Sequence, residues 1–75
     1  MEKETIGFRL RKLRQSVKIS QRKMGELLGV SQSAIDRYER DLSCPNAENF
    51  VVYADYFDVS LDYIFGRCDE PQGRL

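Results

Sequence analysis

A row of polar side chains at helical spacing is the chemically most informative feature of the sequence. Gln32 and Ser33 are followed by Arg37, one helical turn beyond Ser33. Glutamine can pair bidentately with N6 and N7 of adenine, and arginine can pair with O6 and N7 of guanine. Serine can bond to a base or to a phosphate. These residue types therefore predict hydrogen-bonded recognition of a nucleic acid by one face of a helix.

Two short helical patterns, at residues 21–28 and about 32–40, would position this row. Gly25 within the first costs about 1 kcal/mol against alanine, which indicates close approach of another helix. Gly29 suits the left-handed conformation in which helices often end, and Ser31 can cap the helix that follows. A supporting helix, a tight turn and a second helix with one free face make a helix-turn-helix.

Three further helices are predicted from apolar spacing. Apolar residues recur every three or four positions from Ile6 to about Val17, with Arg9 among the basic residues of the other faces. The last two patterns cover about 47–57 and 61–65. No strand-like alternation occurs. The fold class is therefore all-α, a compact five-helix bundle, in which residues 1–66 form a DNA-binding domain and residues 67–75 are expected to be a disordered tail.

The helix ends carry recognisable capping residues. Ser20 and Ser60 are good N-caps, as is Asn46 or Cys44 before the fourth helix. Asp58 follows that helix, where the chain needs the left-handed conformation that aspartate tolerates better than most residues. Residues 1–5 are polar and are expected to be frayed.

The charge of the chain is zero overall but is unevenly distributed. Residues 1–40 contain ten lysines and arginines against five acids, a net charge of +5, and residues 41–75 contain two against seven, a net charge of −5. Such a charge distribution steers the basic side of a molecule toward phosphates. The partner expected for the first half is double-stranded DNA, and the acidic half is free to meet a partner protein.

Several function classes find no support in the sequence. There is no histidine, no glycine-rich phosphate loop and no nucleophile beside a base, so an enzyme is not expected. Cys44 and Cys68 lack the spacing of zinc ligands, and neither a metal nor a cofactor is predicted. No apolar run approaches the ~18 residues of a membrane span, and the N-terminus lacks a signal-peptide profile. The expected location is the cytoplasm.

The combined motif resembles a known family. Gln21-x-x-Met-Gly-x-x-Leu-Gly-Val-Ser-x-x-x-Ile-x-x-Tyr-Glu-Arg is similar to the helix-turn-helix of phage-repressor-like (Cro/XRE group) DNA-binding domains. The flanking segments resemble the first, fourth and fifth helices of that family, so that the resemblance covers about residues 6–66. It implies a small transcriptional regulator, of the repressor type, that binds operator DNA as a dimer with its recognition helix at about 32–40.

The resemblance also implies roles for individual residues. Base contacts fall on Gln32, Ser33 and Arg37. Contacts to the DNA backbone fall on Gln21, Ser31, Arg14, Arg40 and Ser43. Arg14 and Glu39 fall on a pair that commonly forms an internal salt bridge. Asp41 departs from the family pattern, because it places an acid near the expected phosphate contacts.

Two interpretations of the remaining surface stay open. Val52 and Tyr56 lie four residues apart on one helical face and, with Tyr63, are candidates for a homodimer interface. Scattered surface hydrophobic residues are the ordinary alternative. The same fold could also serve as a protein-interaction module, such as an antitoxin or adaptor that binds a partner protein through its acidic half.

Overall fold

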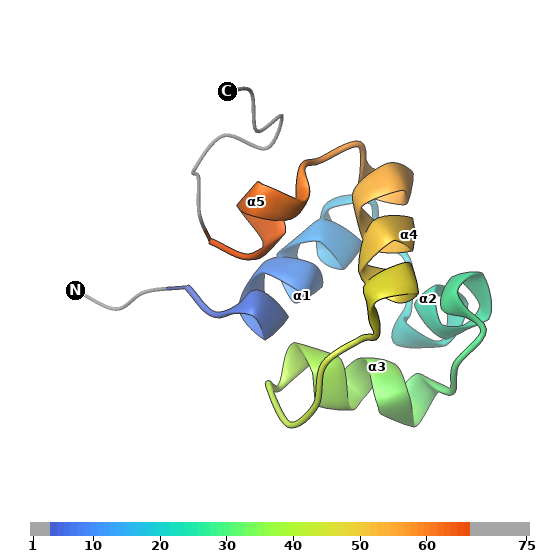
Figure 1. The fold of residues 1–75 in the computed structure, drawn as a ribbon. Coiled ribbons are helices and arrows are strands. Elements are labelled where there is room, and N and C mark those ends of the chain that lie inside the picture. The colour runs from blue at the N-terminus through green and yellow to red at the C-terminus, as the bar shows by residue number, and fades with distance from the viewer. Residues whose placement is uncertain (1–3, 67–75) are drawn as a thin grey trace.

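Five α-helices follow one another in a computed structural model, which describes residues 4–66 (Figure 1). Their bounds are α1 Ile6–Ser16, α2 Gln21–Leu28, α3 Gln32–Glu39, α4 Ala47–Phe57 and α5 Leu61–Ile64. No strand occurs in this part of the chain. The all-α, five-helix prediction is confirmed, and the predicted bounds hold except that three helices end one residue earlier. The predicted tail at 67–75, with Cys68, lies outside the described residues.

Each helix begins at a side chain that caps its first turn. In every case the side-chain oxygen accepts a hydrogen bond from the backbone N–H three residues on, and the caps are Thr5, Ser20, Ser31, Asn46 and Ser60. A cap of this kind stabilises a helix by about 1 kcal/mol. Asn46, not Cys44, caps α4. Thr5 was expected to be frayed, but its hydroxyl fixes the first turn of α1. Residues 1–3 of that prediction lie outside the described residues.

Two predicted left-handed residues end their helices. Gly29 has φ of 73° after α2, and Asp58 has φ of 55° after α4. The structure adds two non-glycine residues that the sequence did not indicate, Lys18 with φ of 61° and Asp41 with φ of 62°. Both lie in the short connections that follow α1 and α3.

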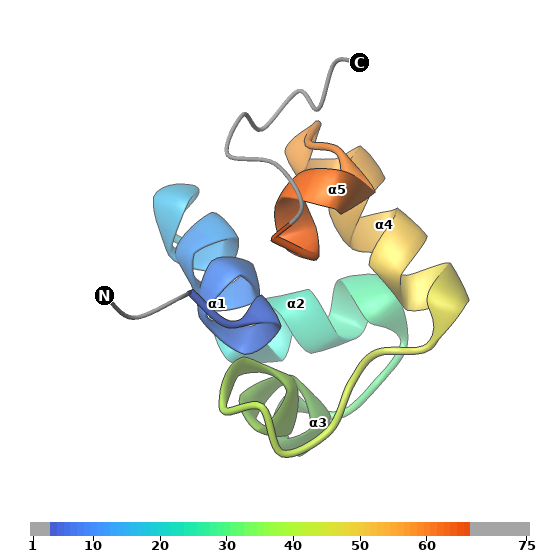
Figure 2. The same cartoon turned by 60° about the vertical axis from the view of Figure 1, so that its left-hand side comes forward.

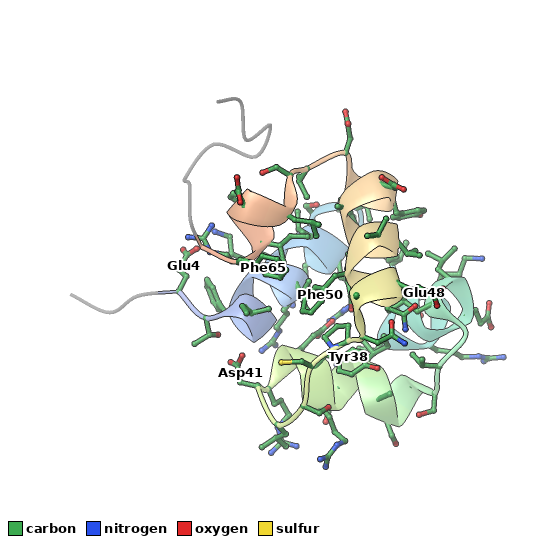
Figure 3. The ribbon with its side chains drawn as sticks, in the orientation of Figure 1. Glu4, Tyr38, Asp41, Glu48, Phe50 and Phe65 are labelled. Carbon is green, nitrogen blue, oxygen red and sulfur yellow. The ribbon has the colours of Figure 1, made fainter. Side chains whose placement is uncertain are left out.

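The core takes buried side chains from all five helices. They are Leu10, Met24, Leu28, Ile35, Tyr53 and Ile64. Partly buried hydrophobic residues surround them, and among these the rings of Phe50 and Phe65 meet edge to face at 5.0 Å between α4 and the end of α5 (Figure 3). This core fixes α2 and α3 relative to the rest of the bundle.

Two predictions about α1 are wrong. Val17 was placed on the apolar stripe but is exposed, because the helix ends at Ser16 and Val17 is only its C-cap. Arg9 was placed on a polar face but is only 8% exposed. Its Nη1 donates to the backbone oxygen of Tyr63 at 3.0 Å, and its guanidinium lies 4.8 Å from the centre of the Tyr63 ring. Arg9 therefore joins α1 to α5.

Candidate nucleic-acid interface

The α3 helix lies at the edge of the molecule. In both views no other described helix lies beyond it, whereas α1, α2 and α4 all lie on its inner side (Figures 1 and 2). Its inner face buries Ile35 and Glu39. The outer face is therefore free to contact a partner along the whole length of the helix.

A tight turn connects α2 to α3. The backbone N–H of Val30 donates to the oxygen of Gly25 at 2.9 Å, and Gly29 adopts the left-handed conformation between the helices. A Cβ at Gly25 would lie 2.6 Å from the oxygen of Val30. The close approach expected at Gly25 is therefore present, but the neighbour is the backbone of the turn and not another helix.

The predicted base-reading residues lie together on the outer face of α3. Gln32, Ser33 and Arg37 are exposed. With Gln21 and Asp36 they line an open hollow of about 580 Å³ between the start of α2 and the outer face of α3. The hollow is thus lined by amide, hydroxyl, guanidinium and carboxylate groups, which together can both donate to and accept from the edges of bases.

The predicted pair of Arg14 and Glu39 forms the buried support of this surface. Arg14 Nε and Nη2 donate to the two carboxylate oxygens of Glu39 at 2.6 and 3.0 Å, and Arg14 Nη1 donates to the oxygen of Ile19 at 2.8 Å. The hydrogen bond to Glu39 raises the pKa of Arg14, against the opposing effect of burial. The side chain of Arg14 is 12% exposed, so its guanidinium serves chiefly to tie α1 to α3.

Gln21 extends this support to the start of α2. Its Nε2 lies 3.3 Å from Oδ1 of Asp36 and 3.2 Å from Oε1 of Glu39, and it donates to both carboxylates. The side chain placed at a phosphate contact by resemblance is thus held against α3 in this structure. The backbone N–H groups at the start of α2 lie at a helix N-terminus, where anions are favoured.

The other residues predicted to contact the DNA backbone lie at the two ends of α3. Ser31 is exposed, and its Oγ accepts from the N–H of Ala34 at 3.1 Å, which leaves its hydroxyl proton for another acceptor. Arg40 is exposed, and its Nη1 lies 3.3 Å from Oδ2 of Asp36. Ser43 is half-buried in the connection to α4.

Asp41 has a partner inside the domain. Its Oδ1 accepts a hydrogen bond from the backbone N–H of Gly7 at 2.9 Å, so that the carboxylate lies beside the first turn of α1 (Figure 3). The N-terminus of a helix carries partial positive charge and stabilises a carboxylate there. The acid that departs from the family pattern therefore joins the loop after α3 to α1.

The three candidates for a dimer interface differ in exposure. Tyr56 is 47% exposed and packs edge to face on Phe57, with 5.0 Å between the ring centroids. Val52 and Tyr63 are half-buried against the core, and the ring of Tyr63 lies against Arg9. Val51 and Phe65, close to these candidates in the chain, are further exposed hydrophobic residues.

No group of three or more potential metal ligands occurs among residues 4–66. Among the described helices, none combines the length and apolar character needed to cross a membrane. Cys44 is an exposed free thiol in the connection between α3 and α4.

Comparison with known proteins assigns the fold to a family. The sequence model of the helix-turn-helix family matches residues 10–64. The transcriptional regulator YobD of Bacillus subtilis is 34% identical over 67 residues, which cover 89% of this chain and 60% of YobD. Repressor protein C2 of Salmonella phage P22 is 36% identical over 64 residues, which cover 85% of this chain and 30% of C2.

A solved structure gives the same result. The crystal structure of the P22 c2 repressor with a synthetic operator matches with a TM-score of 0.77 and 35% identity, covering 83% of this chain and 94% of that one. The chain spans 60% and 30% of the two relatives named above, so it corresponds to one part of each. Proteins of the matched helix-turn-helix family are transcriptional regulators and not enzymes. The chain belongs to the helix-turn-helix family, in its phage-repressor-like (Cro/XRE) group.

Proposed function

We propose that this domain binds double-stranded operator DNA in a sequence-specific manner, as a transcriptional repressor in the cytoplasm. The observation that carries the proposal is the outer face of α3, where Gln32, Ser33 and Arg37 lie exposed together on a helix held from behind. An eight-residue helix is about 12 Å long and fits a major groove about 12 Å wide. The likeness to a repressor that was crystallised with a synthetic operator supports the same conclusion.

Each residue of this face has a distinct role in the proposal. Gln32, in the first turn of α3, pairs with N6 and N7 of an adenine. Ser33 bonds to a neighbouring base, and Arg37 reaches O6 and N7 of a guanine one turn further along the helix. Arg37 makes no ion pair with any residue between 4 and 66, so its guanidinium is available for that contact.

The proposed contacts to phosphate lie around Gln32, Ser33 and Arg37. Ser31 donates from its hydroxyl, and the start of α2 at Gln21 presents backbone N–H groups, as helix N-termini do at phosphates. Arg40 and Ser43 contact the sugar-phosphate backbone of the DNA beyond the C-terminal end of α3. Arg14 acts mainly through the fold, because three of its N–H groups already donate inside the domain.

The salt dependence of DNA binding tests the proposal as a whole. A protein that neutralises about five phosphates loses affinity as salt is added. The logarithm of its association constant for DNA should fall with a slope of about −4 to −5 against the logarithm of the salt concentration. Fluorescence anisotropy with labelled DNA measures this slope. No binding to any duplex at low salt would contradict the proposal. It would favour the alternative of a protein-interaction module, whose partner would meet the acidic half.

The replacement Gln32→Ala tests the base-reading role. We expect it to weaken binding to the preferred operator by about 1–3 kcal/mol, with little effect on scrambled DNA, because only the operator offers the bidentate partner. Gln15→Ala is the matched control, since Gln15 is an exposed glutamine on α1. An equal loss on every sequence for Gln32→Ala would remove this residue from the base-reading set.

We also propose that the domain binds its operator as a homodimer. Tyr56 supplies the exposed ring, and Val52 and Tyr63 supply the half-buried edges of the contact. A symmetric dimer would place its two α3 helices about 34 Å apart, one turn of DNA. Sedimentation decides this point, because a monomer at high micromolar concentration, with and without operator, would contradict the dimer.

A further inference from the structure

Asp36 is an acid on the surface proposed to meet DNA. It lies in the middle of α3 and lines the hollow together with Gln21, Gln32, Ser33 and Arg37. Its side chain is 43% exposed. In the proposed complex this carboxylate would lie in the major groove, within reach of the electrostatic repulsion of the phosphates on either side.

The two acids of α3 are neutralised to different degrees. The carboxylate of Glu39 is buried and meets two N–H groups of Arg14 at 2.6 and 3.0 Å. Asp36 has one exposed cationic partner, Arg40, at 3.3 Å. Arg40 is itself proposed to contact phosphate, and that contact would draw it away from Asp36. The carboxylate of Asp36 is therefore the acidic group on this face whose charge remains uncompensated when DNA binds.

In the domain without DNA, two hydrogen bonds position the carboxylate of Asp36. Oδ1 accepts from Nε2 of Gln21 at 3.3 Å, and Oδ2 accepts from Nη1 of Arg40 at 3.3 Å. The first bond comes from α2 and the second from the end of α3, so the carboxylate is held between them. Its capacity for further hydrogen bonds is as an acceptor only, because an ionised carboxylate has no proton to donate.

We propose that Asp36 is a specificity-determining residue. It lowers the affinity of the domain for duplexes that present no exocyclic amine opposite it. This inference rests on the proposed function. In the major groove, cytosine N4 and adenine N6 present amines that a carboxylate can accept from, whereas guanine O6 and thymine O4 present acceptors. Only an amine can offset the repulsion between Asp36 and the phosphates. Asp36 thus weakens non-specific binding more than it weakens binding to the operator.

A mainly structural role would have a different signature. The pair with Arg40 is an exposed contact between residues four apart on a helix, a type that contributes little to stability. Asparagine at position 36 keeps the shape of the side chain and one acceptor oxygen, and it removes the charge. Its amide can also donate to guanine or thymine, so the base preference at this position should relax.

The test compares the affinity of the wild-type domain and of Asp36→Asn for a selected operator and for a scrambled duplex of equal length. Asp55→Asn is the matched control, because Asp55 is an exposed acid in the last part of α4, at the end of that helix remote from α3 (Figure 1). The control removes the same charge away from the reading face. Thermal unfolding of each variant is measured alongside, to show that all three proteins are folded in the binding experiment.

We expect Asp36→Asn to bind scrambled DNA about three- to tenfold more tightly, which is the effect of removing one charge a few ångströms from one or two phosphates in water. The ratio of operator to scrambled affinity should fall at least threefold, and Asp55→Asn should leave this ratio unchanged. An unchanged ratio for Asp36→Asn, or an equal fall for Asp55→Asn, would overturn the inference. A wild-type domain with no sequence preference would instead overturn the proposed function, and this inference with it.

Discussion

Replacement of Glu39 by glutamine is expected to lower the free energy of unfolding by about 3–5 kcal/mol. Glu39 is 7% exposed, and its carboxylate is the partner of a guanidinium that is itself largely buried. Removal of one member of such a pair leaves the other charge desolvated and uncompensated, which costs about this amount. Since small domains have only about 5–15 kcal/mol of stability in total, much of the variant would be unfolded near 37 °C.

Urea unfolding followed by circular dichroism measures this loss. Glu26→Gln is the control, because Glu26 is an exposed acid on α2 that lies 3.8 Å from Arg22 and 4.0 Å from Lys23. Exposed pairs of this kind contribute about 0–1 kcal/mol, so the control should change stability little. If Glu39→Gln lost no more stability than Glu26→Gln, the pair would not be the main link between α1 and α3.

Replacement of Gly7 by alanine is the second change with a large expected effect. A Cβ at Gly7 would lie 2.5 Å from the oxygen of Tyr38 and 2.8 Å from the oxygen of Glu39. Both are backbone atoms at the end of α3, which cannot move without shifting the helix. Alanine gains about 1 kcal/mol in helix propensity over glycine, but overpacking of this kind costs about 1–3 kcal/mol or more. Because both contacts are backbone oxygens closer than 3.0 Å, we place the cost at about 3 kcal/mol, which gives a net loss of about 2 kcal/mol.

The same variant should also weaken DNA binding, because the contact at Gly7 positions the end of α3. Gly29→Ala is the control, since nothing lies within 4 Å of a Cβ at Gly29 and its cost is confined to a φ of 73°. That strain is about 1–2 kcal/mol and leaves α3 where it is. Equal or greater stability of Gly7→Ala relative to the wild-type domain would show that α1 and α3 are not in close contact there.

The helices were predictable because their signals are local. Ser20 and Ser31 cap their helices within three residues, and Gly29 ends α2 through its own backbone preference. Capping preferences depend on residues only a few positions apart, so they can be recognised in the sequence without knowledge of the fold. The same reasoning gave the bounds of α2 and α4 without error. It placed the ends of the other helices one residue too late, where Val17, Arg40 and Phe65 are C-caps.

What the sequence did not predict depends on contacts between distant residues. Arg9 appears basic and solvent-facing in a helical pattern, yet its partner Tyr63 lies 54 residues away. Asp41 appears misplaced beside phosphates, and its partner Gly7 lies 34 residues away. Neither partner can be identified from spacing. Position next to a core residue does not mark Arg9 either, because Arg11 adjoins the same core residue, Leu10, and is exposed.

The candidate site likewise combines local features that could be predicted with contacts between helices that could not. The exposed row of Gln32, Ser33 and Arg37 follows from helical spacing alone, and the structure places these side chains together. The hydrogen bonds of Gln21 to Asp36 and Glu39 could not be derived, because they join two helices whose relative position is set by the core. The exposed row was therefore predictable, and the support behind it was not.

Selection of bound duplexes from a random DNA pool is the sharpest test of sequence-specific binding by the outer face of α3. We expect one enriched sequence with two symmetric half-sites whose centres are about 10 base pairs apart. Each half-site should contain an adenine whose enrichment disappears when Gln32→Ala replaces the wild-type domain. A pool with no enriched sequence, or the same enriched adenine with Gln32→Ala, would contradict the claim that the outer face of α3 reads DNA.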